Sequence, residues 1–174
     1  MPCLSKPVQV ETITTGETCG ADVALMNQVK RKVKLEGTNQ DGQCLIVFCP
    51  ITSRVGSDVE AAMQNIPSNK RIILVLMHHT RDGDYSTAGK SWSEDYPDIK
   101  LEVHVLYHES MQGLLTCSKN TEAVYKMQEY FQQNGMNPRL RNVLLLVLAI
   151  LAVVLFLVLL SYFELKMRST NSTN

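Results

Sequence analysis

The sequence predicts a three-layer α/β domain with a mostly parallel sheet, followed by one C-terminal transmembrane helix. Two observations predict the sheet. Residues 44–49 and 72–77 are apolar throughout, as is typical of parallel strands buried on both faces, and segments of helical spacing alternate with strands. The third observation is a run of 18 consecutive apolar residues, 143–160. With 161–163 added, this run is long enough to cross a bilayer as a helix.

The first elements are predicted by their periodicity. Val8, Val10 and Thr12 alternate with polar residues, which indicates a half-buried strand over 7–14. Apolar residues then recur at helical spacing over 21–34, opposite a polar face that is rich in Lys and Arg near its end. A short strand is expected just before Gly37.

The middle of the chain predicts a buried strand followed by a helix. We expect the strand over 44–49 to end at Pro50, because proline cannot donate to a strand ladder. Ser57 and Glu60 have the spacing of a capping box, in which each side chain bonds the other residue's backbone N–H. A helix is therefore expected to begin at Ser57 and to end at Pro67.

The remaining elements are a second buried strand over 72–77, a strand over 101–107 and a last helix around 123–131. Alternating polarity places the 101–107 strand nearer an edge of the sheet. Between these strands lies a long acidic loop, 78–100, which is either a functional lid or a variable excursion. Its aromatic stretch from Tyr85 to Tyr96, with Trp92, either binds a partner or packs back on the domain.

Together these elements predict a compact flavodoxin-like domain of four or five strands over residues 1–136. A juxtamembrane linker (137–142), a transmembrane helix (143–163) and a short polar tail (164–174) are expected to follow. This order is typical of tail-anchored, single-pass membrane proteins, so the N-terminal domain is expected in the cytosol. The length of the span slightly favours the endoplasmic reticulum or later secretory membranes over the mitochondrial outer membrane.

Composition excludes several classes of function. The first 138 residues hold 13 Lys and Arg against 16 Asp and Glu, which is no footprint for nucleic acid. The five cysteines are odd in number and include no C-x-x-C pair, so neither a disulfide framework nor a cysteine metal site is expected. We expect reduced thiols, no metal and no cofactor.

Ligands of open parallel sheets bind beyond the carboxyl ends of the strands. After the first buried strand, a loop runs into a helix N-terminus with hydroxyls and one guanidinium, which suits an anion pocket formed by Thr52, Ser53, Arg54, Gly56 and Ser57. A generic strand–loop–helix turn explains the same residues. The loop matches neither the P-loop nor the dinucleotide-binding motif.

The candidates for catalysis are Cys49, His78, His108 and Glu109, each at the end of a predicted strand. Cys49 near a histidine could form a nucleophile pair, but it also suits a buried strand as a small apolar residue. His78 and His79 are consecutive and must face opposite ways, so they are not expected to share a metal.

Residues 44–62 (C-L-I-V-F-C-P-I-T-S-R-V-G-S-D-V-E-A-A) and 74–80 (L-V-L-M-H-H-T) resemble a group of small α/β proteins from fish, as do 106–109 (L-Y-H-E) and 113–115 (G-L-L). The likeness covers most of residues 8–131 and implies no activity. A looser similarity to nucleoside deoxyribosyltransferase-like and TIR-like domains implies an enzyme with a pocket glutamate, for which Glu109 is the candidate.

Two functions follow as expectations. The first is a tail-anchored, non-catalytic protein whose α/β domain binds a protein partner or a second copy of itself, with the bilayer held through 143–163. The alternative is a nucleotide- or nucleoside-binding enzyme of the N-glycosidic-bond or NAD-cleaving type. In that enzyme Ser53, Arg54 and Ser57 would hold phosphate, and Glu109 or His78 would assist the chemistry.

Overall fold

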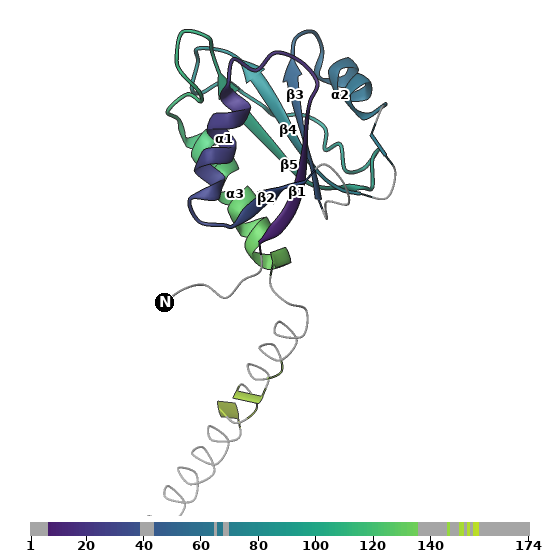
Figure 1. Ribbon diagram of the computed structural model, residues 1–174, viewed down its shortest axis with the longest axis vertical. Coiled ribbons are helices and arrows are strands. Elements are labelled where there is room, and N and C mark those ends of the chain that lie inside the picture. Colours follow the sequence, from purple (N-terminus) through teal and green to yellow (C-terminus); the bar gives the residue numbers. More distant parts are fainter. Residues whose placement is uncertain are drawn as a thin grey trace, which may run out of the picture. The chain divides into compact units, whose positions relative to one another are not determined.

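Five parallel strands form one sheet at the centre of the α/β domain (Figure 1). This computed structural model describes residues 7–38, 44–64, 66–67 and 70–135, and beyond these only 146, 150, 151, 153, 155 and 156. The sheet has the order β2-β1-β3-β4-β5, the order of flavodoxin-type doubly wound sheets. The strands are β1 (Val8–Thr14), β2 (Leu35–Gly37), β3 (Cys44–Ile51), β4 (Arg71–His79) and β5 (Ile99–Tyr107). The predicted parallel sheet is confirmed, and β5 lies at an edge as expected.

Three helices cover the two faces of the sheet. The two helices α1 (Ala21–Lys30) and α3 (Ser118–Gly135) pack on one face, over a core that includes Phe48, Met77 and Phe131. Helix α2 (Val55–Met63) covers the other face. The chain between β4 and β5 supplies no helix in the described residues, and Trp92 from that loop fills the space beside α2 instead.

Helices α1 and α2 end earlier than predicted, at Lys30 and Met63, and two predicted boundaries beside the candidate anion pocket are also wrong. Strand β3 continues through Pro50 to Ile51. Its neighbour β1 ends at Thr14, level with Phe48, so on that side Pro50, which has no N–H to donate, interrupts no strand ladder. Helix α2 begins at Val55 rather than Ser57, and its N-cap residue makes no side-chain cap bond, so the predicted capping box does not form.

The fold class needs one correction, which concerns the transmembrane helix. No helix in the described part of the chain is long and apolar enough to cross a membrane. A span needs about 20 consecutive apolar residues, whereas α3, with 18 residues, keeps a polar face because only its other face packs on the sheet. The observed class is a parallel five-stranded α/β sheet with three helices.

The chain divides into two units, Met1–Gly135 and Met136–Asn174. Most of the predicted span, 143–163, lies outside the described residues, as do the linker and the polar tail. The described positions of this second unit are helical and exposed: Leu146, Ile150, Leu151, Val153, Leu155 and Phe156.

Candidate functional site

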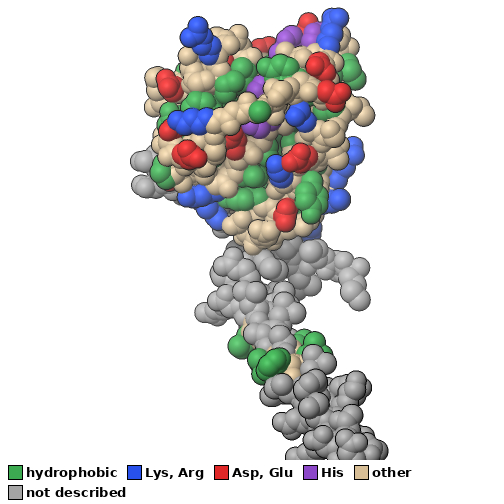
Figure 2. All heavy atoms as spheres, turned by 180° about the vertical axis from the view of Figure 1, so that it is seen from behind, with side chains coloured by type: hydrophobic (Ala, Val, Ile, Leu, Met, Phe, Trp, Pro, Cys, Tyr) green, Lys and Arg blue, Asp and Glu red, His purple; other side chains and the backbone are tan. Residues whose placement is uncertain are grey.

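The ends of β4 and β5 bring two histidines and a glutamate together. The rings of His79 and His108 stack with centroids 4.6 Å apart. His79 Nε2 contacts Glu109 Oε2, and His108 Nε2 lies 3.5 Å from the same oxygen. The ring nitrogens of both histidines therefore face one carboxylate oxygen. Figure 2 shows histidine side chains at the upper end of the domain, beside cationic and anionic side chains.

Two neighbours hold the His108 ring. Arg81 Nε donates to His108 Nε2 over 3.1 Å, and His108 Nδ1 lies 2.8 Å from Ser110 Oγ. In the neutral tautomer that accepts from Arg81, the proton is on Nδ1 and is donated to the Ser110 hydroxyl. The backbone N–H of Ser110 donates to Nδ1 over 3.0 Å in the other neutral tautomer, in which Nε2 carries the proton.

The ligand-capable atoms of His79, His108 and Glu109 all lie within 4.8 Å of one another. His108 is buried, with its side chain 10% exposed, whereas the Glu109 side chain is 57% exposed. A hydrogen bond from its own backbone and a second one from His79 hold the pKa of Glu109 below its ordinary value. Two imidazoles and a carboxylate are a donor set that suits a divalent transition metal. We call these three residues the His–Glu cluster.

His78 belongs to a different network, as its opposite orientation requires. Its Nε2 lies 3.0 Å from His104 Nδ1, and His104 Nε2 lies 3.3 Å from Glu102. Burial, and then the nearby His104 and Lys119, lowers the pKa of His78 to about 4. His78 is therefore neutral at physiological pH. His78 contacts His104 rather than Glu109. The two side chains proposed to assist an enzymatic reaction, His78 and Glu109, therefore do not share one site.

The predicted anion pocket already contains an anion, the carboxylate of Asp58. The backbone N–H groups of Thr52 and Ser53 donate to Asp58 Oδ2 over 2.8 and 2.9 Å. Both hydroxyls also point to this carboxylate, at 3.4 and 3.1 Å from Oδ1. Burial would raise the pKa of Asp58, but these hydrogen bonds lower it on balance. The donors expected for phosphate are thus taken by a side chain of α2.

The other residues of that loop contribute little to a pocket. Arg54 is exposed and is the N-cap residue of α2, and Ser57 lies inside the helix. Gly56 faces the ring of Trp92, which an added Cβ would meet at 3.6 Å. Cys49 is fully buried among the apolar residues on the α2 face, and burial raises its pKa to about 11. Such a thiol is protonated at neutral pH and is a poor nucleophile.

The aromatic residues of the long loop before β5 differ in whether they pack back on the domain. Trp92 packs back on the domain, and its backbone N–H donates to Glu102 over 2.9 Å. Tyr85 instead is 42% exposed, with its ring 5.6 Å from that of His78. On the neighbouring turn after β5, Met111 is 45% exposed and donates its N–H to the His108 carbonyl.

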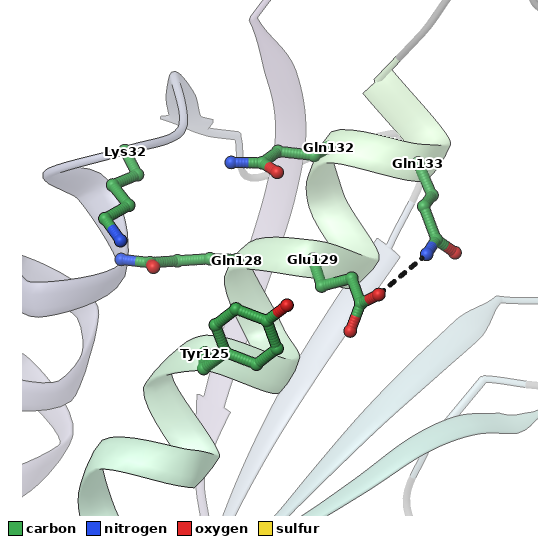
Figure 3. A pocket seen from close by; sticks show the side chains of 6 residues that line it. All are labelled: Lys32, Tyr125, Gln128, Glu129, Gln132 and Gln133. Atoms are coloured by element: carbon green, nitrogen blue, oxygen red, sulfur yellow. Dashed lines mark hydrogen bonds between the residues drawn. The ribbon is translucent and has the colours of Figure 1, made fainter.

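A separate groove of about 320 Å³ runs along α3 near the end of α1 (Figure 3). Its lining residues are Lys32, Tyr125, Gln128, Glu129, Gln132 and Gln133. The side-chain amide of Gln128 donates to two carbonyls near the end of α1, Gln28 O and Val29 O. Gln133 bonds Glu129 within α3. The Gln128 bonds join the two helices, and the lining residues of the groove include no cluster of reactive groups.

Comparison with models of protein families, with curated proteins and with solved structures finds no match to this chain. The site therefore rests on its own geometry. Sequence reasoning named His78, His108 and Glu109 but missed Arg81, Ser110 and Asp58. Asp58 could have been recognised by its position, because it lies in the first turns of α2, four residues after the N-cap residue Arg54. That position is evident only when the helix is known to begin at Val55 rather than at Ser57.

Proposed function

We propose that the α/β domain is a non-catalytic binding module that holds a protein partner at the carboxyl end of its sheet. The ends of β4 and β5 and the loops that follow them supply the exposed residues of this binding face, which are His79, Arg81, Tyr85, Glu109 and Met111. The observation that carries the proposal is the exposure of Tyr85 and Met111 on the two loops that follow β4 and β5. Single exposed apolar side chains are common on protein surfaces, but these two lie beyond the carboxyl ends of the strands, where ligands of parallel sheets bind.

The composition of this face supports a protein as the ligand. Tyr, Met and Arg are enriched at the centres of protein interfaces, where Tyr supplies a rigid apolar body with a polar end. The adjoining loop is acidic, with Asp82 and Asp84 on the same turn as Tyr85. A partner with a cationic patch would complement these carboxylates, and its association would slow as salt is added.

A nucleotide-binding enzyme has less support. Its phosphate would need the Thr52 and Ser53 N–H groups, which donate to Asp58. Of its candidate nucleophiles and bases, Cys49 has a pKa raised by burial, and His78 contacts His104 rather than the Glu109 carboxylate contacted by His79. Neither arrangement assembles a reacting pair.

The test places a photo-crosslinking amino acid at Tyr85 or at Met111 of the full-length chain in cells. Tyr125, which is 59% exposed on α3, is the matched control position. We expect covalent adducts at 85 and 111 but not at 125. The adduct at 111 should disappear when Tyr85→Ala is added, because both positions contact the same partner. An adduct of twice the chain's mass would identify a second copy as the partner. Equal adducts at all three positions would contradict the proposal.

A further inference from the structure

We propose that the His–Glu cluster is a zinc site, in which His79 Nε2, His108 Nε2 and a Glu109 carboxylate oxygen bind one Zn²⁺ ion per chain. The cluster lies on the proposed binding face. Its test needs no partner, however, so the two proposals can fail separately.

The distances fit a zinc ion once the His79 ring turns out of its stack on His108 and its Nε2 moves away from Glu109 Oε2. Zinc binds nitrogen and oxygen at roughly 2.0–2.2 Å, so two ligand atoms of a tetrahedral site lie about 3.4 Å apart. His108 Nε2 and Glu109 Oε2 are 3.5 Å apart, and no pair among the three exceeds 4.8 Å. The side chains of His79 and Glu109 are 43% and 57% exposed, so they can adjust by an ångström without disturbing the core.

The surroundings of His108 also suit a metal ligand. A histidine that binds a metal through one ring nitrogen usually donates the N–H of the other, which fixes the ring and its tautomer. In the tautomer that accepts from Arg81, Nδ1 has Ser110 Oγ at 2.8 Å as its acceptor, and Nε2 lies 3.5 Å from Glu109 Oε2. His79 is the last residue of β4 and His108 directly follows β5, and the ladder pairs His79 with Tyr107.

Arg81 opposes the metal in the structure as it stands. Its Nε–H occupies the lone pair of His108 Nε2 at 3.1 Å, and its charge repels a dication. Zinc binding therefore requires Arg81 to swing away, which its exposed position allows. Arg81 would act as an intrinsic competitor that sets the affinity of the site. Three protein ligands leave a fourth position for water.

Thiols are removed first, because cysteine is the stronger zinc ligand. The full-length chain carries Cys3→Ser, Cys19→Ser and Cys117→Ser, while the buried Cys44 and Cys49 stay. Calorimetric titration with ZnCl₂ is expected to give one site per chain. Titration with cobalt(II), whose visible absorption reports the coordination number, should give the intense bands of a four- or five-coordinate ion.

The variants separate ligands from neighbours. His79→Ala and His108→Ala should each weaken zinc binding by at least about 100-fold, and Ser110→Ala by about tenfold, the range of outer contacts at metal sites. Arg81→Gln should strengthen binding by about tenfold because the competing cation is gone. His104→Gln, which alters the other histidine pair, should change nothing.

Far-UV circular dichroism and thermal unfolding of each metal-free variant show whether the fold is kept. If a histidine variant does not fold, Glu109→Gln, at an exposed position, takes its place as the ligand variant. The proposal is overturned if zinc does not bind, if binding survives the loss of His79 and Glu109, or if His104→Gln abolishes it. Weaker binding in Arg81→Gln would equally contradict the competing role of Arg81.

Discussion

The side-chain amide of Asn120 pairs with both backbone groups of Leu106. Leu106 N–H donates to Asn120 Oδ1 over 2.8 Å, and Asn120 Nδ2 donates to Leu106 O over 2.8 Å. The same Nδ2 donates to Leu115 O, also over 2.8 Å. Strand β5 is at the edge of the sheet, and this buried amide from α3 occupies part of that edge as a neighbouring strand would. It also anchors the turn that carries His108.

Replacing Asn120 should therefore lower stability strongly. Asn120→Ala leaves the Leu106 N–H buried without an acceptor, and each such group costs about 1–3 kcal/mol. We expect the free energy of unfolding in urea to fall by about 3 kcal/mol. Asn27→Ala, at an exposed position on α1, is the matched control and should change it by less than about 0.5 kcal/mol. An unchanged urea midpoint for Asn120→Ala would refute the anchoring role.

The carboxylate of Asp58 should behave as a built-in anion. Asp58→Ala removes the acceptor of the Thr52 and Ser53 N–H groups, so we expect a loss of about 1–2 kcal/mol in the free energy of unfolding. The two N–H groups, no longer bonded to Asp58, should then donate to an external anion. Phosphate at constant ionic strength is expected to raise the melting temperature of Asp58→Ala but not that of the native chain. In the control Glu60→Ala, phosphate should have no such effect.

Gly113 permits the close approach of the turn after β5 to α1. Its φ is +86°, and an added Cβ would lie 2.8 Å from the Ala24 Cβ. Gly113→Ala should cost about 2 kcal/mol, from the left-handed backbone and the collision together. Gly89→Ala meets nothing within 4 Å and serves as the control. Adding Ala24→Gly should restore part of the loss, which thermal unfolding of the double variant can measure.

Periodicity predicted the elements because burial on this sheet follows it closely. The continuous apolar runs became β3 and β4, and the alternating Leu101–Tyr107 segment became the edge strand. The boundaries at Pro50 and Ser57 were wrong because both depend on hydrogen-bond partners that the apolar pattern does not show. Pro50 is tolerated since β1 has already ended, and Ser57 is not a cap since Asp58 binds the loop. The transmembrane helix is the one element that the described residues do not support.

The site was only partly predictable for a similar reason. That polar residues follow β4 and β5 is visible in the sequence, and parallel strands bring their carboxyl ends to one edge. Which of His78 and His79 meets His108 depends on the register of β4 with β5, which places His79 beside Tyr107. Arg81 and Ser110 act through side-chain geometry in loops, where spacing carries no such signal.

His78 should make the stability depend on pH. Its pKa in the folded chain is about 4, whereas the ordinary value, expected for the unfolded chain, is 6.5. Burial is the main cause, and His104 and Lys119 add to it, with Glu102 on the far side of His104. Between pH 6.5 and pH 4, His78 is protonated in the unfolded chain but stays neutral in the folded chain. Stability must therefore fall as the pH falls through this range, and the contribution of His78 levels off below it.

A shift of this size corresponds to about 3 kcal/mol at most. The measurement is urea unfolding of the native chain and of His78→Leu at intervals from pH 7.5 to pH 4. The native chain should lose stability relative to the variant as the pH drops, because leucine has no proton to bind. His79→Leu, which changes an exposed histidine and keeps His78, is the control. It should lose stability relative to His78→Leu as the pH drops, as the native chain does. If the curves of the native chain and His78→Leu stayed parallel throughout, His78 would have to be protonated as readily in the folded chain as in the unfolded one, and its burial against His104 would be wrong.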